Sequence, residues 1–154
     1  MTSALSIRRA VPADAPALAA LRARMDAEMH PDRPALAALA RACEAFFGRE
    51  LGQERFRAWL ALDREHVVGS ALLHVFDTLP RSGVAVARDG RVRNVFVEPA
   101  YRRRGVASEL MRELIAEARR LQIDRLTLGA SAQGKALYET LGFVVRTNEM
   151  IWTP

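Results

Sequence analysis

The chain has 154 residues, of which half are hydrophobic and 27% are charged, a balance that is ordinary for a soluble globular protein. No apolar run approaches the roughly 18 residues that span a bilayer, and the N-terminus lacks the charged and apolar regions of a signal peptide. A single cysteine, Cys43, excludes an internal disulfide and a thiolate-rich zinc site, and three scattered histidines suggest no other metal centre. We therefore expect one cytoplasmic domain over residues 1–154, with no metal and no contact with a membrane.

The net charge is +5, and arginine supplies almost all of the positive side, since Lys135 is the only lysine among 23 basic residues. This excess would suit a polyanion such as a nucleic acid. Arginine and alanine are abundant along the whole chain, however, which is also typical of a GC-rich coding sequence, and we favour that explanation for the overall charge. The run Arg102, Arg103 and Arg104 is a local cluster that needs a separate explanation.

Two helices are expected after a short N-terminal strand. Residues 5–11 alternate imperfectly, as in a strand, and residues 13–29 have apolar side chains at helical spacing. Two prolines interrupt the pattern at 30–34. A second helix is expected over 34–50, and its apolar side, which we expect mainly in the core, consists of Leu36, Leu39, Cys43, Phe46 and Phe47.

From residue 56 the hydrophobic period changes to two, which predicts strands. We expect a hairpin of strands at 56–63 and 67–76, a loop at 77–90 and a strand at 91–98. A helix at 105–121 and a strand at 124–130 follow. The chain then forms a short helix, capped by Ser131 and ending at Leu141, and one bulged strand or two short strands at 143–152. The order β-α-α-β-β-β-α-β-α-β predicts a mixed sheet with helices on its faces.

The segment VFVEPAYRRRGVASEL, residues 95–110, joins a strand to a helix through a turn of three arginines and a glycine. The first amides of the helix have no carbonyl partner, and the aligned peptide dipoles place about half a positive charge at this end. Gly105 allows a ligand to approach the backbone, and guanidinium groups can fork onto phosphate oxygens. The turn therefore predicts a site for a diphosphate, although its spacing fits neither the nucleoside-triphosphate nor the dinucleotide fingerprint.

Further motifs extend this prediction to a family. The turn reads Arg102-x-x-Gly105-x-Ala107 and follows NVFVEP at 94–99, and the segment LGASAQGKALYETLGF at 128–143 ends in an LYExLGF pattern. Together with the order of the elements, these motifs resemble the GCN5-related N-acetyltransferases (GNAT), most specifically over 92–143.

The resemblance implies an α/β fold with a mixed, mostly antiparallel central sheet, splayed middle strands and helices on both faces. It also implies acetyl-CoA as co-substrate, with its diphosphate in the turn and its pantetheine chain along the free edge of strand 91–98. The residues that would bind it are Val95, Phe96, Val97, Arg102, Arg103, Arg104, Gly105, Val106, Ala107, Ser108 and Ser131. Ser131 stands where the family commonly has asparagine, so that contact is left open.

Tyr138 is implied as the catalytic residue, because the equivalent tyrosine of the family faces the thioester sulfur. Without the resemblance, Tyr138 would fit a core position better. No glutamate stands between Arg91 and Val97, where some members carry one, so we expect a water relay, with Glu98 as a weak candidate base and Asn94 as a residue that orients a water. His74 is expected at the rim rather than as a base.

The implied activity is transfer of an acetyl group from acetyl-CoA to an amine of a small molecule or peptide, by direct attack in a ternary complex. A non-catalytic acyl-CoA sensor is the alternative that the missing base leaves open. We expect no nucleic acid partner, because Glu109, Glu113 and Glu117 on helix 105–121 would repel a duplex.

The sequence does not identify the acceptor. Its pocket is expected between 29–50, the loop at 77–90 and the C-terminal strands. The acidic residues available there to a cationic acceptor are Glu28, Asp32, Asp77 and Glu149. A homodimer is also left open.

Overall fold

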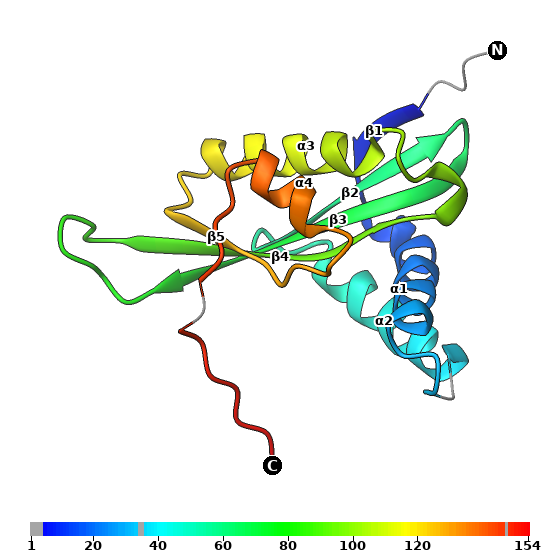
Figure 1. The fold of residues 1–154 in the computed structure, drawn as a ribbon, viewed down its shortest axis with the longest axis horizontal. Coiled ribbons are helices and arrows are strands. Elements are labelled where there is room, and N and C mark those ends of the chain that lie inside the picture. Colours follow the sequence, from blue (N-terminus) through cyan, green and yellow to red (C-terminus); the bar gives the residue numbers. More distant parts are fainter. Residues whose placement is uncertain (1–4, 34–35, 147) are drawn as a thin grey trace.

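The computed structural model describes residues 5–33, 36–146 and 148–154 (Figure 1). Its centre is a sheet in the order β1-β2-β3-β4-β5, formed by β1 (Leu5–Arg9), β2 (Phe56–Asp63), β3 (His66–Thr78), β4 (Ala87–Val97) and β5 (Arg125–Thr127). The first four strands are antiparallel to their neighbours, whereas β5 runs parallel to β4. The predicted mixed, mostly antiparallel sheet is confirmed.

Helices cover both faces of the sheet. The helices α1 (Ala15–Met29) and α2 (Leu36–Glu50) lie on one face, and α3 (Val106–Arg120) and the short α4 (Lys135–Thr140) lie on the other (Figure 1). Short 3-10 turns at Pro12–Asp14 and Pro99–Tyr101 precede α1 and α3. In the described part of the chain, no helix combines the length and the apolar character needed to cross a bilayer.

Each face of the sheet has its own hydrophobic core. On the α1 and α2 side, the core includes Leu18, Phe47 and Leu60, and on the α3 side it includes Leu73 and Leu110. Burying a side chain of this size contributes roughly 1.5–3 kcal/mol. The two cores hold the middle strands of the sheet between them.

The structure changes the prediction for Asp89 and Gly90, which we expected in a loop but which lie inside β4. Asp89 is 3% exposed, and its carboxylate accepts hydrogen bonds from Arg81 and Arg125. A Cβ on Gly90 would lie 2.7 Å from Leu126 and 2.9 Å from Leu73, so the glycine makes room for packing rather than for a turn. Long-range pairing thus extends β4 toward its N-terminal end, and the connecting loop shortens to 79–86.

The core prediction for the second helix is only partly right. Phe47 is buried, but Leu36 and Phe46 are each 41% exposed. Phe46 instead packs edge-on against Phe56 and lies on the open side of α2. The predicted start of this helix at 34–35 lies outside the described residues.

The strand prediction for 143–152 is wrong for the residues that the structure describes there. From Val144 onward, none of those residues takes part in a strand or in a backbone–backbone hydrogen bond. The preceding strand is also shorter than predicted, because β5 pairs with β4 only over Arg125–Thr127. The apolar alternation was real, but a strand forms only where another strand supplies the partner groups.

Glu117 links α3 to the sheet through a carboxylate whose side chain is only 11% exposed. Its carboxylate accepts hydrogen bonds from Arg57 on β2 at 2.9 Å, from Arg9 on β1 at 3.1 Å, and from Arg120 at 2.7 Å. The bond from Arg120, followed by those from the other arginines, lowers the pKa of Glu117 from its ordinary value of 4.5 to about 2, against the opposing effect of burial.

We predict that Glu117→Gln lowers the free energy of unfolding at pH 7 by about 1–3 kcal/mol, because Arg57 stays buried without its counter-charge. The folded pKa lies below the unfolded one, so this contribution is complete above pH 4.5 and disappears as the pH falls toward about 2. Urea denaturation at several pH values measures it. Glu113→Gln on the exposed side of α3 is the matched control, and a constant difference between wild type and Glu117→Gln from pH 7 to pH 2 would contradict the prediction.

Candidate functional site

A bulge in β4 shapes the centre of the site. The pairing register of β3 with β4 shifts between Ser70 and Leu72. Two residues of β4, Asn94 and Val95, therefore lie opposite the single residue Ala71 of β3. Asn94 has a left-handed φ of 52°, which asparagine tolerates better than most residues. Its Nδ2 donates to Ser70 Oγ at 3.1 Å, and Ser70 Oγ donates to the Asn94 carbonyl at 3.1 Å. Both side chains are buried, so these two bonds hold the kink in place.

Beyond the bulge, β4 and β5 separate. Their pairing covers only Asp89–Arg91 with Arg125–Thr127, while β4 continues to Val97. Glu98 donates its amide to Val68 of β3, so by alternation the N–H and C=O of Val97 point to the opposite, open edge. The carbonyl of Val97 accepts a hydrogen bond from Arg102 Nε at 2.8 Å, and its N–H has no acceptor among the described residues.

The arginine turn leads directly into α3. Gly105 precedes the helix with a left-handed φ of 80°, and Arg103 also has a positive φ of 61°. The Glu109 amide, the first in α3 with an acceptor in the turn, donates to the Gly105 carbonyl. Within the described residues, the amides of 103–108 therefore have no hydrogen-bond acceptor. No atom lies within 4 Å of the position that a Cβ on Gly105 would take, so the turn is open at this glycine.

The three arginines of the turn have different roles in the structure. Arg102 donates from its guanidinium to both carboxylate oxygens of Glu28 on α1, at 2.7 and 2.8 Å, and its guanidinium lies over the ring of Phe96. It braces the turn against α1 rather than projecting outward. Arg103 and Arg104 are exposed, with Arg104 over the ring of Tyr101. The free positive charge of the turn thus lies at Arg103 and Arg104.

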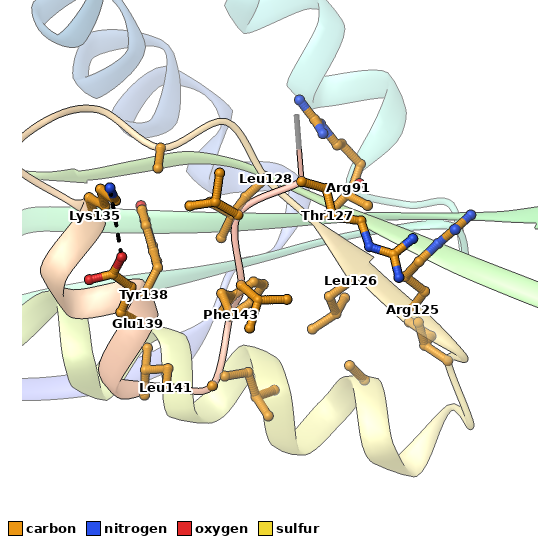
Figure 2. Close-up of a pocket in the computed structure, with 18 of the residues that line it drawn as sticks. Arg91, Arg125, Leu126, Thr127, Leu128, Lys135, Tyr138, Glu139, Leu141 and Phe143 are labelled. Carbon is orange, nitrogen blue, oxygen red and sulfur yellow. Dashed lines mark ion pairs between the residues drawn. The ribbon is translucent and has the colours of Figure 1, made fainter. Parts of the chain in front are cut away.

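Tyr138 lies on α4 beside the opening between β4 and β5. Its side chain packs edge-on against Phe143, and the residue is 8% exposed. Figure 2 shows its hydroxyl pointing away from Leu141 and toward the strands. Among the described residues, none forms a hydrogen bond with this hydroxyl. Burial raises the pKa of Tyr138, so the phenol stays protonated at neutral pH and is able to donate.

Ser131 stabilises the turn before α4 rather than the helix start itself. Its Oγ accepts a hydrogen bond from the Gly134 amide at 3.1 Å, and its carbonyl accepts one from the Lys135 amide at 3.0 Å. The N-cap of α4 is Gly134. A side chain at Gly134 would meet the Tyr138 ring at 2.8 Å, so this glycine allows the turn to pack on the tyrosine.

The face of the sheet toward α2 carries aromatic rings and unpaired positive charge. The ring of His74 lies between Phe56 and Phe76, with centroid distances of 6.1 and 5.9 Å. Burial, then the charges of Arg93 and Arg55, lower the pKa of His74, which keeps the imidazole neutral at pH 7. Within the described chain, Arg93 takes part in no ion pair.

Arg91 is the second unpaired arginine of this face. A Cβ on Gly129 would lie 3.8 Å from its Nη2, so the guanidinium lies over the chain just beyond β5. Figure 2 shows the Arg91 side chain directed away from Leu126 and Phe143. Arg91 also forms no ion pair with a described residue, so both arginines offer charge to a ligand.

Two of the four acidic residues predicted near the acceptor, and also the candidate base, form ion pairs within the chain. Glu28 pairs with Arg102, Asp77 with Arg88 at 3.4 Å, and Glu98, the candidate base, with Arg24 of α1. Asp32 and Glu149 lie exposed. Among the described residues, no group of three or more His, Cys, Asp or Glu is arranged to hold a metal ion.

Sequence reasoning missed Ser70 and Arg91. An asparagine inside an apolar strand was a signal for the bulge, because asparagine is disfavoured in strands and tolerates left-handed backbone. Its partner Ser70 carried no signal of its own, since the two residues meet only through strand pairing. In the sequence, nothing distinguished Arg91 from the other 21 arginines. Only the separation of β4 from β5 shows that it lies beside the opening between them.

Residues 18–143 match the acetyltransferase (GNAT) family. The chain belongs to this family. A curated relative, a glucosamine 6-phosphate N-acetyltransferase of Trypanosoma brucei brucei, is 32% identical to this GNAT chain over 84 residues. The match covers 54% of the chain and 55% of the relative, so the chain spans about half the length of that relative.

Solved structures support the same fold. A predicted acetyltransferase with acetyl-CoA from Clostridium acetobutylicum has a TM-score of 0.87 and 22% identity, covering 97% of this GNAT chain and 96% of the other. A GCN5-related N-acetyltransferase from Ralstonia eutropha JMP134 has a TM-score of 0.84 and 23% identity, covering 98% and 99%. The predicted fold class is therefore confirmed.

Proposed function

We propose that this protein is an N-acetyltransferase that moves the acetyl group of acetyl-CoA to an amine in a ternary complex. The observation that carries the proposal is two neighbouring sets of donors without a described acceptor, the Val97 N–H on the open edge of β4 and the amides of 103–108 at the start of α3. Backbone amides aimed at one place cost no reorganisation when a ligand arrives, which is why they suit both binding and transition-state stabilisation.

The residues present fit acetyl-CoA. The amides of 103–108, the positive end of the α3 dipole and the exposed guanidinium groups of Arg103 and Arg104 suit a diphosphate. Val106, Ala107 and Ser108 form the first turn of that helix. Arg102 would act by holding the turn, since its guanidinium is already bonded to Glu28. Val95, Phe96 and Val97 offer the open edge to the pantetheine amides.

Acetyl-CoA supplies the acetyl group as a thioester. An amide on the β4 edge would polarise the thioester carbonyl, and the Tyr138 hydroxyl would donate a hydrogen bond to the leaving sulfur. A phenol pKa near 10 against a thiol near 8.5 makes full proton donation uphill by roughly 2 kcal/mol. Because burial raises the pKa of Tyr138 further, it acts as a hydrogen-bond donor rather than as an acid.

The acceptor amine must lose a proton, which at pH 7 costs roughly 4.6 kcal/mol for an alkyl amine of pKa about 10.4. Glu98 pairs with Arg24, which disfavours it as a base. Asn94 Oδ1 is buried with no hydrogen-bond partner among the described atoms and can accept a bond from a water beside the bulge. A water relay that starts at Asn94 is therefore the route that we propose.

The test of the acetyl-CoA site uses two glycines in the same backbone conformation. Gly105 and Gly83 both have φ of 80° with no atom within 4 Å of an added Cβ. We predict that Gly105→Ala and Gly83→Ala each destabilise the fold by about 1 kcal/mol through backbone strain. Only Gly105→Ala should weaken the rise in melting temperature caused by acetyl-CoA, as read by differential scanning fluorimetry. Equal acetyl-CoA shifts for both variants would place the diphosphate elsewhere.

Tyr138→Phe should reduce kcat by about 10- to 100-fold, with little change in KM for acetyl-CoA, because the hydroxyl acts on the leaving group. A thiol-release assay with a panel of amines measures this. Tyr101→Phe removes the other tyrosine hydroxyl, which donates to Asp63 at 2.8 Å, and should leave kcat unchanged. A raised KM with normal kcat would make Tyr138 a packing residue. If no amine gives turnover while acetyl-CoA still stabilises the protein, the acyl-CoA sensor replaces the enzyme.

The acceptor that the site supports best carries a negative group as well as an amine. Arg91 and Arg93 lie on the face of the sheet opposite α3, near the opening between β4 and β5, without ion pairs to described residues. His74 is neutral and adds no charge to oppose them. The curated relative acts, by its name, on glucosamine 6-phosphate, an amine with a phosphate. An amino sugar phosphate is therefore the first acceptor to test.

We predict that glucosamine 6-phosphate is acetylated with a kcat/KM about tenfold or more above that of glucosamine, the size of one charge-assisted contact. Arg91→Ala and Arg93→Ala should remove this preference without changing the KM for acetyl-CoA. Arg88→Ala, on the same strand but paired with Asp77, is the control. Equal use of both sugars, or a preference that survives both substitutions, would exclude an anionic acceptor.

A further inference from the structure

His74 lies on the face of the sheet that the acceptor is proposed to use. Strand pairing places it directly opposite Arg91 of β4, and Leu72, two residues earlier on β3, lies opposite Arg93. Residues paired in this way share a face of the sheet. Leu72 belongs to the core on the α1 and α2 side, so His74, Arg91 and Arg93 all lie on that side. No local pattern in the sequence indicated these neighbours, which is why His74 was expected only at the rim.

The half-buried His74 ring is held by its neighbours, but its nitrogens are free. Phe56 and Phe76 lie on either side of it, tilted by 53° and 52° to the imidazole plane. Neither ring nitrogen forms a hydrogen bond with a described residue. Among the described residues with covered side chains, Asn94 Oδ1 is the one fully buried polar atom without a partner, so solvent reaches the His74 nitrogens. The imidazole can therefore exchange a proton with water.

The proposed acetyl transfer needs a group that keeps the proton of the acceptor amine. The amide of Asn94, where the water relay begins, can orient a water but cannot hold a proton, and Glu98 pairs with Arg24. Ala71, opposite the bulge, is three residues from His74, or about 10 Å along β3. Waters at hydrogen-bond separations of about 2.8 Å bridge such a gap in a short chain.

We propose that the imidazole of His74 receives the proton at the far end of this relay and is the base of the acetyl transfer. This role rests on the proposed function. The ammonium form of the acceptor gives one proton to the relay, and the last water gives one to an imidazole nitrogen. The neutral amine then attacks the thioester carbonyl, and the N–C bond forms as the C–S bond breaks. The proton lost by the new amide goes to the departing thiolate, and His74 releases its own proton to solvent.

The charges around His74 decide which acceptor it can serve. Arg91 and Arg93 of β4 and Arg55 before β2 are cationic, whereas the carboxylate of Glu50 on α2 already pairs with Arg55 at 3.6 Å. Burial, and then the charges of Arg93 and Arg55, lower the pKa of His74, so the free protein holds a weak base. An anionic group of the acceptor bound at Arg91 and Arg93 would offset those charges and strengthen the base.

The acidity of the acceptor ammonium matters as well. Proton transfer from an alkyl ammonium of pKa about 10.4 to an imidazole of pKa about 6.5 is unfavourable by about 10⁴-fold. From an ammonium of pKa about 8, the value of an α-amino group, it is unfavourable by only about 30-fold. Neighbouring oxygen substituents lower the pKa of an amine, so an amino sugar phosphate combines a weakly basic amine with an anion.

The pH dependence of kcat tests the role of His74, with saturating glucosamine 6-phosphate and acetyl-CoA. His74→Gln should lower kcat by about 10- to 100-fold at pH 6.5, where the amine is protonated and needs a base. At pH 9 the amine is already neutral, so the two proteins should have similar kcat values. His66→Gln changes an exposed histidine at the start of β3 and should match the unmodified chain at both pH values.

The possible outcomes separate this role from the proposed function. A loss of the same size at pH 6.5 and pH 9 would make His74 a packing residue, and normal kcat at both would exclude it as the base. In either case the acetyltransferase proposal would stand. No turnover by the unmodified chain with any amine would overturn the proposed function, and the role of His74 with it.

A second measurement follows the His74 imidazole in the unmodified chain by NMR titration, with CoA in place of acetyl-CoA so that no transfer occurs. Glucosamine 6-phosphate should raise the pKa of His74 by about 1, a tenfold change in proton affinity, because its phosphate offsets the arginine charges. Glucosamine should leave it unchanged, and His66 should respond to neither sugar. A His74 pKa that ignores the phosphate sugar, or responds equally to both sugars, would contradict the proposal.

Discussion

The two hydrogen bonds between Ser70 and Asn94 are the contact on which the candidate site depends. They hold a left-handed residue and an extra residue in the middle of a buried sheet, where a regular ladder would otherwise form. The kink directs β4 away from β5 and leaves one strand edge with free donors. Without that separation, the amides of β4 would be used up in pairing with β5, and no ligand could reach them.

Ion pairs within the chain engage some of its arginines and leave others available. Arg57, Arg9 and Arg120 surround Glu117, and Arg81 and Arg125 surround Asp89. These pairs join helices and loops to the sheet. Among the arginines that form no ion pair with a described residue, Arg103 and Arg104 lie at the start of α3, and Arg91 and Arg93 lie on β4, on the face opposite α3. Only guanidinium groups without a carboxylate partner in the chain can offer their charge to a ligand at the site.

The opening between β4 and β5 has a different character on each side. On the β4 side, free amides at the sheet edge and the start of α3 suit a thioester co-substrate with a diphosphate. On the β5 side, a groove of about 950 Å³ lies between the strand and the segment after α4. Tyr138 lies between these two features, with its ring in the groove and its hydroxyl toward the strands. A change that altered the groove would therefore also alter the surroundings of this hydroxyl.

The sequence alone was enough for the features that depend on local chemistry. The period of α3, the glycine and arginines of its leading turn, and the LYExLGF motif predicted the family and the fold class, because helical periodicity and tight turns depend on neighbouring residues. Tertiary structure decided the rest. Asp89-Gly90 reads as a turn but is a strand, since Arg81, Arg125, Leu73 and Leu126 arrive from other segments. Arg102 reads as a phosphate ligand but braces α1, since Glu28 lies 74 residues away in the chain. The C-terminal apolar pattern predicts a strand, yet a strand needs a partner, and no local pattern specifies whether that partner belongs to the same chain.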